Sequence, residues 1–272
     1  MSKFQELVNQ LPSDQRNIQG ASGKWNLPLD YCFFGVPQSD FFGWSELNDI
    51  PSNCLGFHFY LGGTPVELIS EFSQSKYPAQ IEKLVIGDSS YAAGSSLDYS
   101  DLVKAIQNVE FPKLKELHLG IWELFCNAHC MFGKIGNVTN LLQHSPMIEK
   151  LGLYGQFELS SPLNFSNLKE LTIELEDYTT GSNGGFITNK TLANLLNSNF
   201  PSIEKIFIDL NCEDDDYGYR FPEDFLSGDN FPLLRKIEIT GGFSKGEKER
   251  LQSSEIFKKE SVNFLLEDML DS

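Results

Sequence analysis

The chain has 272 residues, of which 40% are hydrophobic and 12% are aromatic, enough to bury a sizeable core. Its 38 acidic and 21 basic side chains give a formal net charge of -17. Nucleic acid and anionic membranes are therefore not expected as direct partners, because both are negatively charged themselves. An acidic surface favours a basic partner, although it also serves solubility alone.

The beginning of the chain and its cysteines bear on the cellular compartment. MSKFQELVNQLPSDQ lacks the basic region and apolar core of a signal peptide, and no apolar run approaches the roughly 18 residues of a spanning helix. The five cysteines lie at positions 32, 54, 126, 130 and 212. Without a secretion signal, cysteines scattered in this way are expected to be reduced thiols. We expect a cytoplasmic protein without a cofactor.

Residues 1–76 predict an N-terminal cap that packs on the rest of one continuous domain. The range 24–63 is rich in aromatic residues, glycine and proline. CLGFHFYLG (54–62) predicts a strand that extends the sheet of the following region, and TPVELISEFSQSKYP (64–78) predicts the first helix that covers it.

Residues 77–241 contain six hexapeptides of the form aliphatic-x-x-aliphatic-x-aliphatic. They are IEKLVI (81–86), LKELHL (114–119), IEKLGL (148–153), LKELTI (168–173), IEKIFI (203–208) and LRKIEI (234–239), with first positions 33, 34, 20, 35 and 31 residues apart. Most follow an aromatic-Pro or Ser-Pro pair. The last two aliphatics of each point to one face of a strand, and only neighbouring copies can cover them. The hexapeptides are therefore predicted to lie side by side.

Helical patterns fill most of the intervals between the hexapeptides. They cover 97–111, 135–145, 188–200 and, in a shorter form, 221–231, whereas the 20-residue interval leaves room only for a loop or a single turn. Strands alternating with helices predict a parallel sheet lined by helices on its outer side.

This pattern resembles a leucine-rich-repeat protein of the ribonuclease-inhibitor-like kind. More narrowly, LVIGD (84–88), FPKLKELHLG (111–120), VTNLLQHSPMIEKLGLYG (138–155), NLKELTIE (167–174) and DLNCEDDDYG (209–218) are similar to an uncharacterised family of bacterial cytoplasmic leucine-rich-repeat proteins, some with WGR domains. The resemblance implies an α/β solenoid, here a short right-handed arc with the parallel sheet on the inner face and the helices outside. It also implies a binding protein without an assigned reaction.

Residues 242–272 predict the C-terminal cap. A polar break at GGFSKGEKER (241–250) precedes EIFKKESVNFLLEDML (255–270), whose apolar residues fit one face of an amphipathic helix. We expect this helix to cover the last repeat rather than to detach and bind a partner.

Three patterns bear on catalysis or metal binding. Ser89 in Gly-Asp-Ser follows a strand, as in one class of esterases, but no histidine stands three residues after an aspartate to act as its base. Cys126, His129 and Cys130 are zinc-type ligands without a second cysteine pair. NCEDDDYG (211–218) lacks the glutamate that ends a calcium loop. A hydrolase using Ser89 or a metal-dependent activity near Cys126 remains the alternative to a non-enzymatic protein.

The leading prediction is a protein-binding module, in a narrower form an inhibitor or immunity protein for a basic toxin. Its contacts would come from the exposed face of the sheet and from the acidic, aromatic segments that leave the strands. Polar residues on that face are expected on any solvated sheet, whereas exposed Val85, Tyr154 and Phe207 are more informative. The predicted binding residues are Val85, Glu116, His118, Trp122, Tyr154, Glu174, Phe207, Asp209, Asp214, Asp215, Asp216 and Tyr217.

Overall fold

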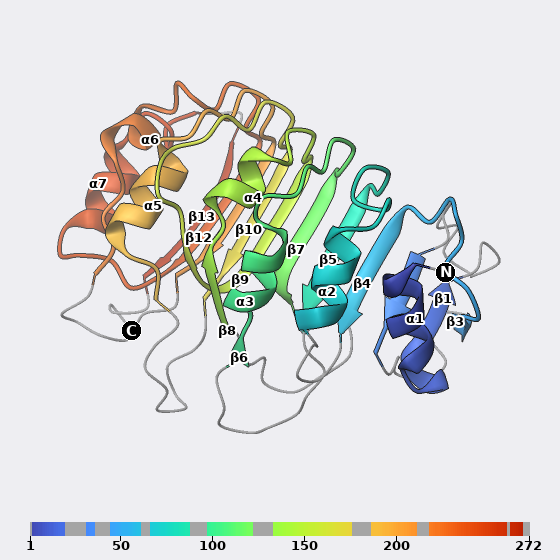
Figure 1. Ribbon diagram of the computed structural model, residues 1–272. Coiled ribbons are helices and arrows are strands. Elements are labelled where there is room, and N and C mark those ends of the chain that lie inside the picture. The colour runs from blue at the N-terminus through green and yellow to red at the C-terminus, as the bar shows by residue number, and fades with distance from the viewer. Residues whose placement is uncertain are drawn as a thin grey trace.

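The computed structural model describes residues 2–19, 31–35, 44–60, 66–87, 97–121, 133–175, 186–210, 218–259 and 262–268. Within these ranges the protein is a mixed α/β structure with one mostly parallel, open sheet whose end strands are β3 and β13. The helices α2 to α7 lie on one side of this sheet (Figure 1).

The parallel strands follow one another across the sheet in chain order. They are β2 (Tyr31–Phe34), β4 (Gly56–Tyr60), β5 (Lys83–Gly87), β7 (Glu116–Ile121), β9 (Lys150–Glu158), β10 (Glu170–Glu174), β11 (Lys205–Asp209), β12 (Lys236–Gly241) and β13 (Asn263–Asp268). The six hexapeptides form β5, β7, β9, β10, β11 and β12, and equivalent residues pair with one another at each step. Their predicted parallel arrangement in register is confirmed.

The helices between these strands occupy the predicted segments, in shorter form. They are α2 (Val66–Ser73), α3 (Ser100–Ile106), α4 (Thr139–Gln143), α5 (Asn189–Leu196) and α6 (Glu223–Ser227). Thr188 caps α5, since its side chain accepts a hydrogen bond of 3.1 Å from the Thr191 backbone N–H. Residues 159–169, between β9 and β10, contain no helix, as the short interval predicts.

A turn recurs before five strands, and in four of them it begins with the Phe-Pro or Ser-Pro pair seen in the sequence, whereas the remaining turn begins with Phe165-Ser166. In each, the backbone N–H of the first aliphatic residue donates to the carbonyl of the residue three positions earlier, which is Phe111, Ser145, Phe165, Phe200 or Phe231. Phe165 stacks on Phe200 and Phe200 on Phe231, with ring centroids 5.1 and 5.6 Å apart. These rings extend the core beneath the turns.

One hydrophobic core runs from Phe4 to Ile256 along the helix-covered side of the sheet. All three aliphatics of every hexapeptide belong to it, and none is more than 3% exposed. Burial of such side chains contributes about 1.5–3 kcal/mol each. The six hexapeptides therefore build the centre of this core.

The N-terminal part contains more strands than the sequence pattern predicts. The predicted strand and helix of this region are β4 and α2, but α1 (Lys3–Gln10), η1 (Ser13–Gln15), β1 (Arg16–Gln19), β2 and β3 (Trp44–Glu46) were not predicted. β1 pairs antiparallel with β2 and β3, whereas β2 runs parallel to β4. A short additional ladder joins β6 (Leu97–Asp98) to β8 (Gly133–Asn137), which pairs with the extended end of β9.

The prediction of an amphipathic helix over 255–270 is wrong. The described part of this segment contains β13, a parallel strand whose Leu266 packs against the core while Leu265 is 45% exposed. A strand is favoured here because it pairs the backbone groups of β12 that a helix would leave unpaired. The covering helix is instead α7 (Glu247–Ser253), which begins in the expected polar break (241–250) and ends just after it.

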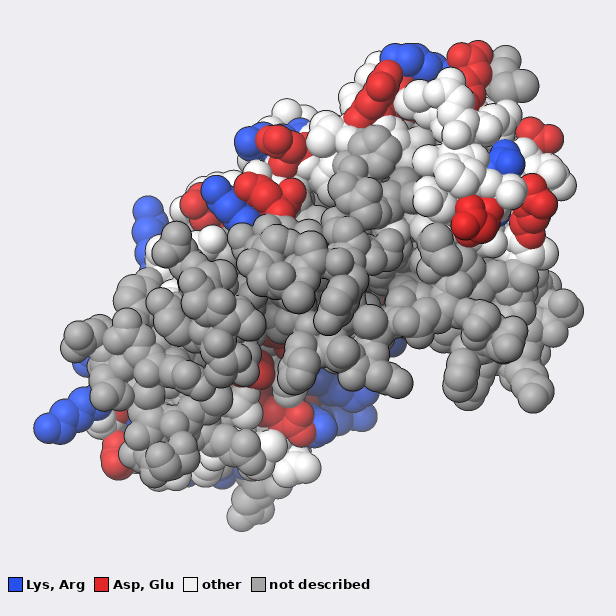
Figure 2. Space-filling model, turned by 90° about the horizontal axis from the view of Figure 1, so that it is seen from below, with Lys and Arg blue, Asp and Glu red and all other residues white. Residues whose placement is uncertain are grey.

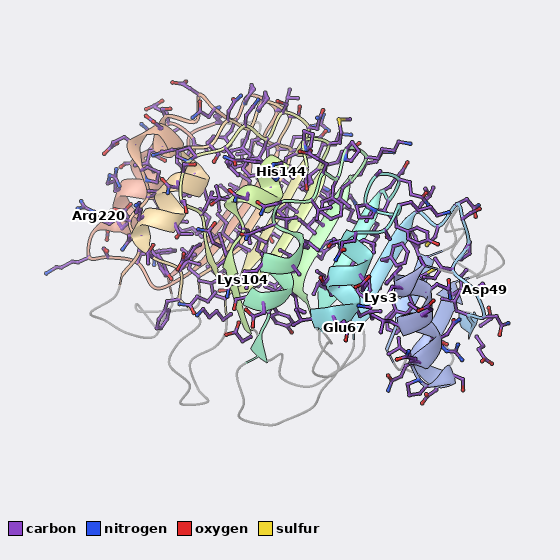
Figure 3. All side chains as sticks on the ribbon, viewed as in Figure 1. Lys3, Asp49, Glu67, Lys104, His144 and Arg220 are labelled. Atoms are coloured by element: carbon purple, nitrogen blue, oxygen red, sulfur yellow. The ribbon has the colours of Figure 1, made fainter. Side chains whose placement is uncertain are left out.

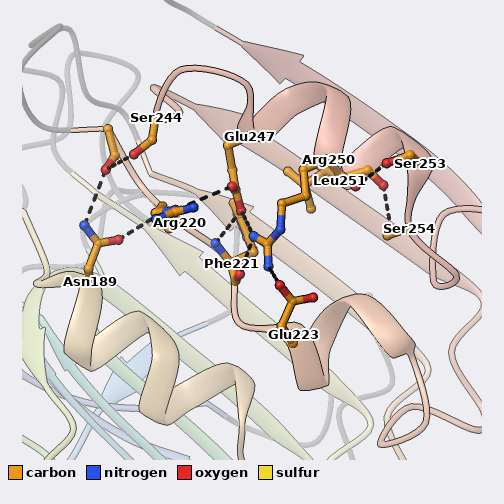
Figure 4. A network of polar contacts seen from close by, with 11 residues as sticks. Asn189, Arg220, Phe221, Glu223, Ser244, Glu247, Arg250, Leu251, Ser253 and Ser254 are labelled. Atoms are coloured by element: carbon orange, nitrogen blue, oxygen red, sulfur yellow. Dashed lines mark hydrogen bonds and ion pairs between the residues drawn. The ribbon is translucent and has the colours of Figure 1, made fainter.

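A buried carboxylate anchors α7 to the preceding α6 region (Figure 4). The side chain of Glu247 is 3% exposed and accepts hydrogen bonds from the Phe221 backbone N–H at 2.7 Å and from Arg250 at 2.6 Å. Arg250 also donates to the Phe221 carbonyl at 2.8 Å and pairs with Glu223. This network closes the C-terminal end of the core.

Arg250→Met is therefore expected to destabilise the protein by about 3 kcal/mol, because it removes the closer cation of the buried Glu247 carboxylate and leaves only the exposed Arg220 at 4.0 Å. Lys258→Met is the matched control, since its pair with Glu255 is exposed at 57% and 71% and is expected to contribute less than about 1 kcal/mol. Urea denaturation measures both. Equal losses in the two variants would contradict a structural role for the network.

Candidate functional site

The side of the parallel sheet away from the helices, here called the polar face, carries the residues between the buried aliphatics. Across β5, β7, β9, β10, β11 and β12, it includes Lys83, Val85, Glu116, His118, Lys150, Gly152, Tyr154, Glu170, Thr172, Glu174, Lys205, Phe207, Asp209, Lys236, Glu238 and Thr240. The side-chain alternation of these strands therefore agrees with the predicted set.

The first residues of the strands form a row whose charge alternates over the first five strands. Lys83, Glu116, Lys150, Glu170, Lys205 and Lys236 are successive neighbours. Lys83 lies 2.8 Å from Glu116, and Glu170 lies 3.4 Å from Lys150 and 2.8 Å from Lys205. At the end of the row Lys236 pairs with Glu238 on its own strand at 2.6 Å.

A second row of opposite phase lies one residue earlier. It consists of Glu82, Lys115, Glu149, Lys169, Glu204 and Arg235. Three ion pairs join neighbours in this row: Glu82–Lys115 at 2.9 Å, Glu149–Lys169 at 2.6 Å and Glu204–Arg235 at 3.7 Å. The backbone hydrogen bonds repeat in the same way. The carbonyl of each of the first five residues accepts from two consecutive backbone N–H groups of the next strand, as Glu82 does from Lys115 and Glu116. The two rows favour this register, since a slip of one residue would place like charges opposite each other.

These rows were missed at the sequence level, although a signal was present. The two residues after the first aliphatic read Glu-Lys, Lys-Glu, Glu-Lys, Lys-Glu, Glu-Lys and Arg-Lys in the six hexapeptides. The alternation, complete over the first five copies, indicates that charges pair across the strands. The polar face is consequently close to neutral and does not carry the acidic surplus of the chain.

Three predicted residues form one hydrogen-bonded cluster in the middle of the sheet. The Nε2 atom of His118 lies 3.0 Å from Glu116 Oε1, and its Nδ1 atom lies 3.4 Å from the Tyr154 hydroxyl. A neutral His118 satisfies both contacts if Nε2–H donates to the carboxylate and Nδ1 accepts from the phenol. Burial acts to raise the pKa of Glu116, but the His118 hydrogen bond and Lys83 outweigh it and lower that pKa to about 2.

The expected exposure of Tyr154 is wrong, since this residue is 6% exposed. Its ring folds back over Gly152 and stacks on His118 with a centroid distance of 6.1 Å. A Cβ atom at position 152 would overlap both the Tyr154 ring and His118 Nδ1, so glycine leaves the space that this cluster occupies. Tyr154 is therefore a packed side chain rather than an exposed contact.

The expected exposure of Val85 is also wrong. Val85 is 1% exposed and forms a separate buried cluster with Phe33 and Tyr60 on the polar side of β2, β4 and β5. His58 lies among them, with its ring 6.2 Å from that of Phe33 and 5.7 Å from that of Tyr31. The aromatic N-terminal strands bury this end of the face.

His58 is held neutral in this apolar setting. It is 7% exposed, and its Nε2 atom has no hydrogen-bond partner within the described ranges. Burial lowers the pKa of His58 to about 3, and the nearby Lys83 charge adds a smaller effect in the same direction. A histidine of this kind couples the stability of the protein to pH.

The remaining predicted residues lie further along the sheet or outside the described residues. Glu174, Phe207 and Asp209 are half-buried on β10 and β11, where Glu174 is opposite Asp209. The residues that lie outside the described ranges are Trp122, Asp214, Asp215, Asp216 and Tyr217, together with the alternative catalytic and metal candidates Ser89, Cys126, His129 and Cys130. Among the residues that the structure describes, no three metal-binding side chains gather.

Charges of both signs are also mixed on the helix-covered side. Lys3 lies 3.3 Å from Glu67 and 2.8 Å from Glu71, so that α1 and α2 are bridged (Figure 3). Lys104 pairs with Asp101 on α3 at 2.8 Å. Seen from below, acidic and basic side chains again lie next to each other (Figure 2).

The acidic surplus is concentrated in the segments that leave the strands. Segments 88–96, 122–132, 176–185 and 211–217 together contain eight acidic residues and no lysine or arginine. They follow β5, β7, β10 and β11, whose carboxyl ends share one edge of the sheet because the strands are parallel. These four segments are called the strand-exit segments below.

Comparisons with known proteins do not assign the chain to a family. No family model matches it, and no curated protein matches it significantly. The crystal structure of a Bacteroides fragilis protein is similar over 85% of this chain and 79% of its own, with 16% identity and a TM-score of 0.47. A likeness at this level carries no inference about function. In the described part of the chain, none of the helices has the length and apolar composition needed to cross a bilayer.

The buried His58 predicts a loss of stability in mild acid. Its pKa is about 3 in the folded protein and its ordinary value is 6.5, so the folded protein binds fewer protons than the unfolded chain between these values and its stability falls as the pH falls. Between pH 7.5 and pH 5.0 we expect the free energy of unfolding to drop by about 2 kcal/mol from this group. Urea denaturation at a series of pH values measures the drop.

His58→Phe is expected to abolish this contribution, because phenylalanine does not titrate and suits the aromatic surroundings. His144→Gln is the matched control, since the His144 side chain is 34% exposed. An equal drop in the wild type and in His58→Phe would show that His58 is not the responsible group.

Proposed function

We propose that this protein is a non-enzymatic module that binds another protein through its strand-exit segments, and that the bound surface is basic. The carrying observation is the separation of charge: the charges within each of the two rows pair with one another, whereas the strand-exit segments hold eight acidic residues and no lysine or arginine. Uncompensated carboxylates attract a basic surface and accelerate its association.

The proposed architecture is a leucine-rich-repeat solenoid, a short right-handed arc of the ribonuclease-inhibitor-like kind. The recurring turn, the in-register strands and the helices on one side support it. In such a scaffold the segments leaving the strands are free to vary while the core stays constant. A cytoplasmic location belongs to the same proposal.

Within the strand-exit segments, the proposed contacts are Asp214, Asp215, Asp216 and Tyr217 after β11 and Trp122 after β7. Tyr and Trp are enriched at binding hot spots, where carboxylates add charge recognition. Glu174, Asp209 and the half-buried Phe207 continue this surface onto the polar face. Val85 and Tyr154 are not part of it, because both are buried. An inhibitor or immunity protein against a basic toxin is the narrower form of this proposal.

The test compares the wild type with a variant in which Asp214, Asp215 and Asp216 are replaced by Asn. Each is immobilised and exposed to lysate of the source cells, and also to lysozyme as a defined basic protein, at low and high salt. We expect the wild type to retain one or more basic proteins at low salt, and the variant to retain at least tenfold less. Mass spectrometry and titration calorimetry provide the readouts.

A variant with Asp224, Asp229 and Glu255 replaced by their amides is the matched control, because it removes the same charge from exposed sites elsewhere. It is expected to bind like the wild type. Equal loss of binding in both variants would mean that net charge alone matters, and retention of acidic or no proteins would refute the proposal.

A further inference from the structure

Two cysteines lie in contact beneath the N-terminal strands. The Sγ atoms of Cys32 in β2 and Cys54 before β4 are 3.2 Å apart, closer than the about 3.5–4.0 Å of ordinary carbon contacts. Both side chains are fully buried in the main core. The Cys54 Sγ atom is also 3.2 Å from the Gly56 carbonyl oxygen.

Their positions are equivalent to core positions that carry larger side chains further along the sheet. Cys54-x-x-Phe57-x-Phe59 follows the hexapeptide pattern, so Cys54 occupies the first apolar position. Cys32 pairs with Phe57 and occupies the second apolar position of its own strand. At the step from β5 to β7 the corresponding neighbours are Leu84 and Leu114, both completely buried. Two thiols thus replace two bulky side chains at one step of the core.

We propose that Cys32 and Cys54 are a modification site at which a disulfide oxidant, such as oxidised glutathione, closes a disulfide bond. One thiolate attacks the oxidant to give a mixed disulfide and releases one reduced thiol. The second cysteine then displaces the other half of the oxidant, so the two cysteines lose two electrons and two protons and the oxidant leaves as two thiols. This inference is independent of the proposed function.

The bond would join β2 to the turn that begins β4 and would close a loop of 22 residues. A link of this length restricts the unfolded chain and stabilises the folded protein. We expect the oxidised form to melt roughly 5–10 °C above the reduced form. Because both thiols are buried, the reaction requires local opening of the N-terminal strands or takes place while they fold.

Peptide mapping tests the bond directly. The full-length protein is incubated in a glutathione redox buffer, and a parallel sample is refolded in the same buffer so that burial cannot delay the reaction. Thiols are then blocked by alkylation. Trypsin leaves both cysteines in peptide 25–76, because no lysine or arginine lies between Trp25 and Ser75. We expect this peptide to carry no alkyl group and to be lighter than its reduced, unmodified form by two hydrogen atoms.

Cleavage before Asp40 and Asp49 then separates the two halves of the peptide only after reduction, which locates the bond. Cys54→Val is expected to abolish both the bond and the gain in melting temperature, whereas Cys212→Ser is expected to keep both. Two alkylations on peptide 25–76 in both samples, or bonds formed mainly with the other three cysteines, would overturn the proposal.

Discussion

The in-register parallel pairing of the six hexapeptides is the constraint on which the rest of the structure depends. Each strand places its aliphatics under the helices and its charges on the polar face, so a slip by one residue would bury charge and expose the core. The alternating ion pairs of neighbouring strands add a second reason for the same register. Hydrophobic pattern and charge pattern therefore select one arrangement.

The same arrangement separates the residues that stabilise the fold from those proposed to bind a partner. Ion pairs join the charged residues at the first positions of the strands on the polar face, and aromatic packing around His58 and Val85 closes the N-terminal end of that face. The Glu247–Arg250 network closes the other end of the core. The strand-exit segments carry eight of the 17 surplus negative charges of the chain, which is why the proposed binding surface is an edge of the sheet and not its face.

The strands and helices between 77 and 241 could be predicted because their periodicity, spacing and turn residues agree with one another. The segment 255–270 could not, since its apolar residues fit a helical stripe while FLLED also forms a strand, and pairing with β12 decides between them. Four-residue β2 carries too short a pattern to stand out. For Val85 and Tyr154, alternation indicated the correct side of the sheet but not the neighbours that cover them, such as the ring space over Gly152.

Cross-linking of engineered cysteines tests the register most directly. Lys150 is opposite Glu170, whereas Thr172 lies two residues further along the same face of β10. A short thiol-bridging reagent is expected to join Lys150→Cys to Glu170→Cys efficiently and to leave the combination of Lys150→Cys with Thr172→Cys largely unlinked. Preferential linkage of the second combination, or equal linkage of both, would contradict the parallel in-register sheet.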